Sequence, residues 1–168
     1  MKGIILHGGA GTRLRPITHT GPKQLIPVAN KPMSQYALDY LVESGIEYIA
    51  IILGNIFPEK VKEYYGDGSN FGCRIKYIEQ GSPLGIAHAI SLTQEFVDGD
   101  RFVVVLGDNL VGGKIHNFAK KFEESDLDSL LLLAHTSHPH DFGIAKLSDG
   151  GKIVELIEKP RDPPSNLA

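Results

Sequence analysis

Residues 4–13 read Ile-Ile-Leu-His-Gly-Gly-Ala-Gly-Thr-Arg, an apolar run that passes without a gap into a glycine loop. A short, continuous apolar run is typical of a strand that is covered on both faces of a sheet. The three glycines Gly8, Gly9 and Gly11 let the backbone turn its N–H groups toward an anion. Arg13 adds a planar, permanently charged fork. The stretch therefore predicts a strand that ends in a phosphate-binding loop.

The loop departs from two common phosphate-binding motifs. A Walker A loop ends in Gly-Lys-Ser or Gly-Lys-Thr, whereas both Gly-Lys pairs of this chain are followed by isoleucine. The dinucleotide fingerprint needs a third glycine where Leu14 stands. It also needs an acid after the second strand, where the chain has Gly54 and Asn55. The loop is thus expected to bind phosphate in neither of these two ways.

Apolar runs alternate with helix-like patterns along the whole chain. The expected strands are Ile4–Leu6, Ile49–Leu53, Ile75–Ile78, Phe102–Leu106, Leu130–Ala134 and Ile153–Ile157. The expected helices are one capped by Ser34 and closed by Gly45, one from Pro58 to Gly66, Ile86–Phe96 and Ile115–Phe122. This alternation predicts right-handed βαβ crossovers, and so a three-layer α/β fold with a mainly parallel central sheet. Such sheets bind ligands outside the carboxyl ends of their strands.

Composition excludes several classes of function. The 168 residues carry 17 Lys and Arg against 20 Asp and Glu, a net charge of −3 that offers no general field for a nucleic-acid backbone. The single cysteine rules out an internal disulfide and a cysteine-based zinc site. No apolar stretch approaches the length of a membrane span. We therefore expect a cytoplasmic protein that binds neither nucleic acid nor membranes.

Two charged residues and one histidine cluster stand out beyond the loop. Lys23 lies in a proline-flanked segment that can aim its ammonium at a phosphate, although a solvated loop lysine fits equally well. Asp108 follows the wholly apolar strand expected at Phe102–Leu106, and a carboxylate at the carboxyl end of a strand suits Mg²⁺. The alternative for Asp108 is a simple turn that caps the next helix. The cluster of His135, His138 and His140 contains Pro139, so we expect a loop there rather than a zinc site.

Taken in order, these motifs resemble those of the sugar-1-phosphate nucleotidylyltransferases, and most closely their thymidylyltransferase branch. The matching segments are Gly8–Leu14, Pro22–Val28, Lys31–Met33, Gly66–Gly72, Gln80–Gly85, Leu106–Asn109 and Glu158–Pro160. The resemblance extends over essentially the whole chain. It implies a Rossmann-like nucleotidyltransferase domain over residues 1–168, which we expect to be the N-terminal part of a longer domain.

The resemblance also implies a reaction and the residues that perform it. The reaction would convert dTTP and glucose 1-phosphate to dTDP-glucose and diphosphate, with Mg²⁺ as cofactor. The implied catalytic residues are Arg13, Lys23, Asp108 and Lys159. The implied nucleotide-binding residues are Gly8, Gly9, Gly11, Thr12, Arg13, Gln24, Gln80 and Gly85. The sugar phosphate is expected at Gly143, Glu158 and Lys159, and Mg²⁺ at Asp108.

Two other functions remain open on the same residues. Thymine and uracil differ by one methyl group, and such a contact is worth on the order of 1 kcal/mol. A UTP–glucose-1-phosphate uridylyltransferase is therefore the first alternative. A non-catalytic, regulatory module that binds nucleotide sugars is the second, although the four intact catalytic candidates argue against it. We expect the complete protein to be a homo-oligomer.

His7 departs from the family pattern, which usually has alanine before the paired glycines. The residue would lie beside the nucleotide pocket. It is expected either to fill space or to pack on the base or ribose, and the first interpretation is favoured.

Overall fold

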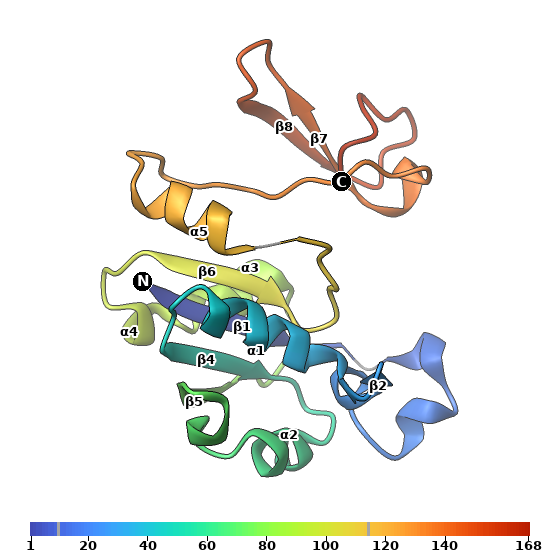
Figure 1. Cartoon of the computed structure of the whole chain (residues 1–168). Helices are drawn as coiled ribbons and strands as arrows, with labels where there is room; N and C mark the ends of the chain where they lie inside the picture. The colour runs from blue at the N-terminus through green and yellow to red at the C-terminus, as the bar shows by residue number, and fades with distance from the viewer. Residues whose placement is uncertain (10, 114) are drawn as a thin grey trace. The chain divides into compact units, whose positions relative to one another are not determined.

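The computed structural model describes residues 1–9, 11–113 and 115–168, which form two compact units (Figure 1). The first unit runs from Met1 to Asp126 and contains a parallel sheet with helices. The second runs from Leu127 to Ala168 and contains a hairpin. In the described ranges, no helix has the length and apolar character needed to cross a membrane.

A four-stranded parallel sheet in the order β5-β4-β1-β6 forms the centre of the first unit (Figure 1). Its strands are β1 (Lys2–His7), β4 (Tyr48–Leu53), β5 (Arg74–Glu79) and β6 (Phe102–Leu106). Strand β1 lies between two neighbours, so that Ile5 is paired with Ile51 on one side and with Val105 on the other. Both β1 and β4 are buried along most of their length, as their continuous apolar pattern predicts. The predicted parallel sheet is confirmed.

Helices cover both faces of this sheet. They are α1 (Met33–Glu43), α2 (Pro58–Tyr65), α3 (Ile86–Ser91), α4 (Gln94–Val97) and α5 (Ile115–Glu123). One apolar cluster joins Ile5 of β1 to Leu38 of α1 and Tyr65 of α2. A second cluster joins Ile4 on the opposite face of β1 to Ala89 of α3. The three-layer α/β fold is therefore confirmed, with β1 contributing alternate residues to both cores.

Short elements complete the first unit. Strands β2 (Pro27–Val28) and β3 (Lys31–Pro32) pair antiparallel. Short 3-10 turns occupy Thr12–Leu14, Ile17–His19, Lys23–Leu25 and Ser69–Phe71.

Two helix predictions need correction. The prediction of a single helix over residues 86–96 is wrong, because the helix is interrupted between α3, which ends at Ser91, and α4, which begins at Gln94. There the hydroxyl of Thr93 donates to the carbonyl of Ile90 at 2.7 Å, a side-chain bond that competes with continued helix. Ser34 is also not the N-cap of α1, since the helix begins at Met33 after Pro32. Its hydroxyl is instead buried 2.6 Å from the hydroxyl of Tyr65.

The second unit contains the antiparallel hairpin of β7 (Gly143–Leu147) and β8 (Ile153–Glu158), preceded by a 3-10 turn at Pro139–Asp141. The strand expected at Leu130–Ala134 is wrong, because these residues form no ladder with another strand in the described part of the chain. Ala134 and Ala168 exchange backbone hydrogen bonds at 2.8 and 2.9 Å, but that contact is confined to one short bridge. An apolar run becomes a strand only where a neighbouring backbone can pair with it.

His7 ends β1 as one of the most deeply buried polar residues of the chain, with 5% of its surface exposed. Its ring meets Tyr65 edge to face, with centroids 6.0 Å apart. Neither ring nitrogen has a hydrogen-bond partner among the described residues. Burial lowers the pKa of His7 from 6.5 to about 3, although the nearby carboxylate of Asp108 acts in the opposite direction. The imidazole is therefore neutral in the folded chain at physiological pH.

The buried pair of Ser34 and Tyr65 should contribute measurably to stability. Ser34→Ala or Tyr65→Phe removes one hydroxyl and leaves the other without a partner, so each should lower the free energy of unfolding by about 1–3 kcal/mol. The double variant should lose less than the sum of the two, which urea denaturation measures as a coupling energy. Tyr64→Phe is the matched control, because the Tyr64 hydroxyl bonds Gln35 on the exposed surface. Strictly additive losses would contradict the assignment.

The buried His7 should also make stability depend on pH. Because its pKa in the folded chain lies below its unfolded value, the unfolded chain binds the proton more readily. Stability should therefore fall as pH is lowered from about 6.5 to 3, with a slope of up to about 1.4 kcal/mol per pH unit from this group. His7→Phe should flatten the curve of unfolding free energy in that window. Parallel curves for the two proteins would show that His7 is not buried in its neutral form.

Candidate functional site

The glycine loop packs closely against the segment that carries Lys23. Gly9 and Gly11 have φ angles of 98° and 61°, which favour glycine. A Cβ added to Gly11 would lie 2.8 Å from Cγ2 of Thr18 and 3.0 Å from Cβ of Lys23. The Thr18 hydroxyl donates to the carbonyl of Gly11 at 2.9 Å. Glycine at position 11 is thus required both by backbone conformation and by the approach of the neighbouring segment.

Gln24 supports the loop from behind. Its side chain is 1% exposed, and Nε2 donates to the carbonyl of Gly8 at 2.6 Å. Its Oε1 has no partner among the described residues. The resemblance suggested Gln24 as a nucleotide-binding residue. In the structure its contact is with the loop backbone, so any effect on a nucleotide would pass through Gly8.

Lys23 and Asp108 form an ion pair beside this loop, with Nζ against Oδ2. Lys23 begins a short 3-10 turn after Pro22, and Asp108 lies two residues beyond the end of β6. The two side chains are 20% and 35% exposed, so the pair remains accessible to solvent. Residues that are 85 positions apart in the sequence thus meet at the carboxyl edge of the sheet, as the topology of parallel sheets predicts.

The turn that carries Asp108 is anchored at both ends. The N–H of Gly107 donates to the carbonyl of Leu6 at 2.9 Å. Further on, the Tyr40 hydroxyl donates to the carbonyl of Val111 at 2.9 Å and accepts its N–H at 3.2 Å. Sequence reasoning missed Tyr40, because nothing in the spacing links a residue of α1 to a loop 71 positions later. The anchoring limits where the Asp108 carboxylate can lie.

Gln80 and Gly85 meet after the end of β5. Gln80 Nε2 donates to the carbonyl of Gly85 at 3.1 Å and lies 3.3 Å from Nδ1 of His88. A Cβ added to Gly8 would lie 3.8 Å from Gln80 Oε1, which places the amide beside the glycine loop. The apolar side chains of Leu84 and Ile86 flank Gly85 and are 69% and 55% exposed. An amide beside exposed apolar side chains can bind a planar ring that carries polar groups. Sequence reasoning did not single out Leu84 and Ile86 for this setting.

Arg13 and Thr12 lie on the exposed side of the loop, in the 3-10 turn Thr12–Leu14. The guanidinium is therefore accessible to an anion in solvent. Its fork geometry suits two oxygens of one phosphate.

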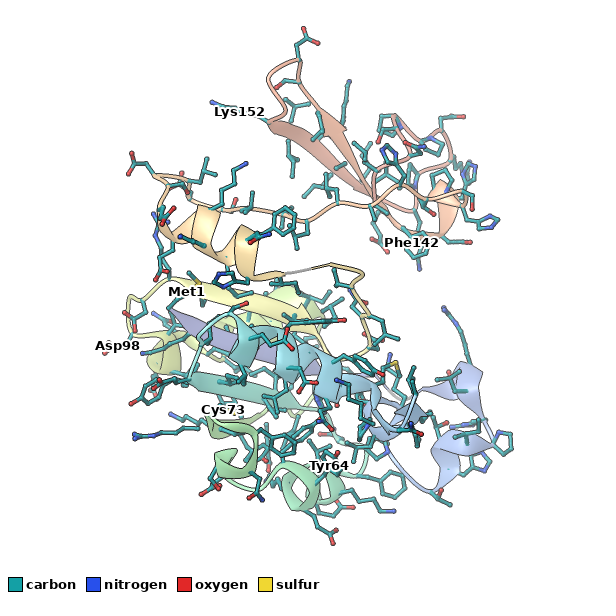
Figure 2. All side chains as sticks on the ribbon, viewed as in Figure 1. Met1, Tyr64, Cys73, Asp98, Phe142 and Lys152 are labelled. Atoms are coloured by element: carbon teal, nitrogen blue, oxygen red, sulfur yellow. The ribbon has the colours of Figure 1, made fainter. Side chains whose placement is uncertain are left out.

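The expected sugar-phosphate residues form a group at one end of the hairpin in the second unit. Gly143 pairs with Glu158, and a Cβ added to Gly143 would lie 3.1 Å from Glu158 Oε2. Lys159 Nζ lies 3.8 Å from Glu158 Oε1. The backbone N–H of Lys159 donates to the carbonyl of Phe142 at 3.0 Å. Lys159 adopts a φ of 44°, an unusual conformation for a residue other than glycine. All of these side chains are exposed, including Phe142, which Figure 2 labels.

The metal-binding capacity of the described residues is limited. Within residues 1–9, 11–113 and 115–168, no three His, Cys, Asp or Glu side chains are grouped as metal ligands would be. Asp108 offers a partly exposed carboxylate at the carboxyl edge of the sheet. This fits Mg²⁺, which takes one or two carboxylates together with waters and substrate phosphates. The histidines of the second unit make other contacts, such as His135 Nδ1 with Asn166 Oδ1 at 2.9 Å.

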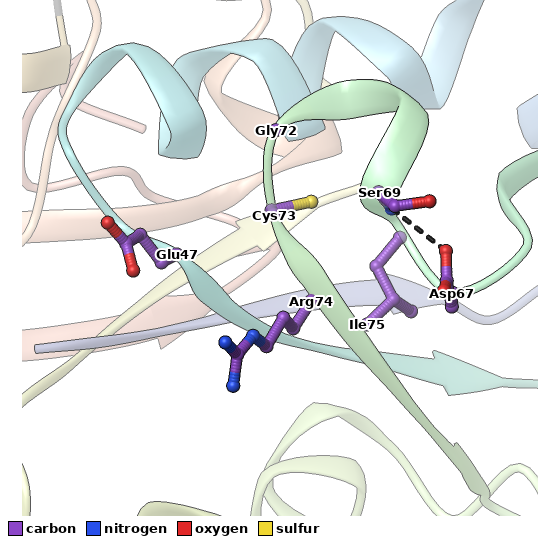
Figure 3. Close-up of a pocket in the computed structure, with 7 residues that line it drawn as sticks. All are labelled: Glu47, Asp67, Ser69, Gly72, Cys73, Arg74 and Ile75. Atoms are coloured by element: carbon purple, nitrogen blue, oxygen red, sulfur yellow. Dashed lines mark hydrogen bonds between the residues drawn. The ribbon is translucent and has the colours of Figure 1, made fainter.

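A hollow of about 550 Å³ lies away from these residues (Figure 3). Its lining includes Glu47, just before β4, and Arg74, the first residue of β5. These positions mark the amino ends of the strands. The Asp67 carboxylate there accepts the N–H of Ser69 at 3.0 Å. Hydrogen bonding by the side chain of Ser69, and secondly by its backbone, lowers the pKa of Asp67. Because parallel sheets bind ligands at their carboxyl ends, this hollow is not the candidate site.

Comparison with known proteins agrees with the geometry. The chain matches the family model for nucleotidyl transferases over residues 2–168. It is 49% identical to the low-salt glycan biosynthesis nucleotidyltransferase Agl11 of Haloferax volcanii and 45% identical to a glucose-1-phosphate thymidylyltransferase of Streptomyces griseus. Each match covers the whole chain but 47% of the relative, so the chain spans about half the length of these curated relatives.

A solved structure shows the same relationship. The crystal structure of a Bacillus anthracis protein, assigned as a glucose-1-phosphate thymidylyltransferase and holding a sucrose, superimposes with a TM-score of 0.95 at 39% identity. It covers the whole of this chain and 68% of that protein. The glycine loop, the lysine and aspartate at the carboxyl edge, the sequence match and the shared fold agree: this chain belongs to the nucleotidyl transferase family.

Proposed function

We propose that the protein transfers a thymidylyl group from dTTP to glucose 1-phosphate, giving dTDP-glucose and diphosphate. The observation that carries this proposal is the ion pair of Lys23 and Asp108 beside the glycine loop. The pair lies at the edge where a parallel sheet binds its ligands, which supports a role for the cation toward phosphate and for the carboxylate toward a metal ion. The thymidylyltransferase relatives support the choice of substrates.

The reaction needs positioning and charge stabilisation more than covalent catalysis. An oxygen of the sugar phosphate attacks the α-phosphorus of the nucleotide, and the bond to the diphosphate breaks. Both substrates are polyanions, so cations must hold them together in line. We assign Arg13 to the triphosphate, including the departing diphosphate, and Lys23 to the α-phosphate. The backbone N–H groups of Gly8, Gly9 and Gly11, with Thr12, would hold the remaining oxygens.

Asp108 is proposed to hold Mg²⁺, with waters and phosphate oxygens completing the coordination. When bound, the metal supplies a Lewis acid that stabilises negative charge on the phosphate being transferred. In the structure the Asp108 carboxylate is already paired with the Lys23 ammonium. With a cation held at Asp108, the Lys23 ammonium would no longer be needed to neutralise that carboxylate and would be free to face the α-phosphate.

The remaining candidates are proposed to recognise the base and the sugar. The Gln80 side chain and the backbone of Gly85 present amide groups that can pair with the edge of a pyrimidine. For this to happen, Gln80 must exchange its present bond to the Gly85 carbonyl for one to the base. In the second unit, Gly143, Glu158 and Lys159 are proposed to bind the sugar hydroxyls and phosphate.

Measurement of diphosphate release tests the proposed function. Because the chain spans about half the length of its curated relatives, it is assayed beside the complete Streptomyces griseus protein. With glucose 1-phosphate and Mg²⁺, dTTP should give the higher kcat/KM and UTP the next. A clear preference for UTP would make the protein a uridylyltransferase. If this chain binds nucleotide sugar without turnover while the Streptomyces griseus protein turns over, a binding module would be favoured.

Arg13 and Arg15 form a matched pair for testing the loop, since both are exposed and lie two residues apart. Arg13→Ala should lower kcat by about 10²–10³-fold, because one charge-stabilising donor is lost from the transition state. Arg15→Ala should change kcat by less than about threefold, as expected of an exposed charge outside the site. Steady-state kinetics of both variants provide the measurement. Equal effects of the two substitutions would remove Arg13 from the proposed mechanism.

A further inference from the structure

Among the described residues, the buried side-chain polar atoms without a hydrogen-bond partner are the two ring nitrogens of His7 and Oε1 of Gln24. A buried polar atom without a hydrogen bond costs about 1–3 kcal/mol. Such atoms are uncommon in folded proteins and usually mark a water, an ion or a catalytic group that completes the site. An apolar ring of the same size would avoid the cost. The position of His7 shows which group could supply the missing partner.

The ring of His7 lies directly against the turn that presents Asp108. A Cβ added to Gly107 would lie 3.0 Å from Cδ2 of His7 and 3.4 Å from its Nε2. On the other side the ring is held by the edge contact with Tyr65, which is itself tied to Ser34 of α1. The imidazole is therefore held between α2 and the Gly107 backbone, with its Nε2 edge next to the residue that precedes Asp108.

We propose that an unpaired nitrogen of His7 accepts a hydrogen bond from a water in the hydration shell of the divalent cation that Asp108 would hold. This inference rests on the proposed function. Mg²⁺ dehydrates reluctantly and keeps several waters in protein sites, and these polarised waters are strong donors. A neutral imidazole offers one lone pair to such a donor. Partners outside the first coordination shell commonly orient a metal site, and their loss lowers metal affinity by about 10–100-fold.

The experiment measures how strongly a cation tightens nucleotide binding. Isothermal titration gives the Kd of dTTP for the chain with and without Mn²⁺ at pH 8, where a histidine of ordinary pKa is already neutral. The ratio of the two constants is the metal-dependent gain. His7→Phe keeps a ring of similar size without nitrogens, and it should reduce this gain by about tenfold while leaving metal-free dTTP binding unchanged. Its melting temperature without ligand should rise, because the unpaired nitrogens are gone.

Two further variants serve as rescue and control. His7→Gln restores a hydrogen-bonding group and should recover part of the gain. His116→Phe replaces an exposed histidine of α5 and should change neither the gain nor the melting temperature.

The outcomes separate this inference from the proposed function. If Asp108→Asn abolishes the gain but His7→Phe leaves it intact, the role of His7 is overturned and the cation site stands. If His7→Phe loses the gain and also melts at a lower temperature, the ring has a structural role only, and the inference is again overturned. If Mn²⁺ gives no gain in the unmodified chain, or Asp108→Asn retains it, the cation site itself fails and the inference fails with it.

Discussion

The parallel pairing of β1 with β4 on one side and β6 on the other is the constraint on which the rest of the first unit depends. Because the three strands are in register and run the same way, their carboxyl ends come together at one edge. The glycine loop after β1 and Asp108 after β6 are therefore neighbours in space. Every contact of the candidate site in this unit is built on that edge, and the apolar residues of the strands stabilise it from both faces.

Backbone geometry then determines where the charges lie. Gly11 allows the loop to approach the Lys23 segment closely, since an added Cβ there would lie 2.8 Å from Thr18 Cγ2 and 3.0 Å from Lys23 Cβ. Gln24 ties that segment to the loop from its buried side. As a result Lys23 reaches Asp108 across 85 positions of sequence, and both groups stay partly exposed to solvent.

The same edge also carries the least stable features of the core. His7 and Gln24 are buried, and each leaves polar atoms without partners among the described residues. Such atoms reduce stability and are tolerated where they serve binding or catalysis. In this chain they lie directly behind the loop and beneath the Asp108 turn. The centre of the sheet is closely packed with apolar side chains, whereas its carboxyl edge holds these buried polar atoms at a cost in stability.

By itself, the sequence determined the layer architecture and the candidate positions for the site. The apolar runs of β1 and β4 are local signals, since strands buried on both faces need apolar residues at successive positions. The Pro58–Gly66 limits of α2 are also local, since fixed turn conformations need a particular residue type. The glycine loop and Asp108 follow from the same reasoning, because functional residues come directly after strands of a parallel sheet.

Only the tertiary structure decided features that depend on a distant partner. Leu130–Ala134 looks like a strand but has no described strand to pair with, and Ser34 looks like a cap but bonds Tyr65 instead. The hydrogen bond from Tyr40 to Val111 could not be predicted from local sequence, because its partner lies in another element. The same holds for the ring nitrogens of His7, whose lack of partners among the described residues depends on the elements packed around the ring. Local sequence specifies what a segment can form, whereas hydrogen bonds and burial between segments decide what it does form.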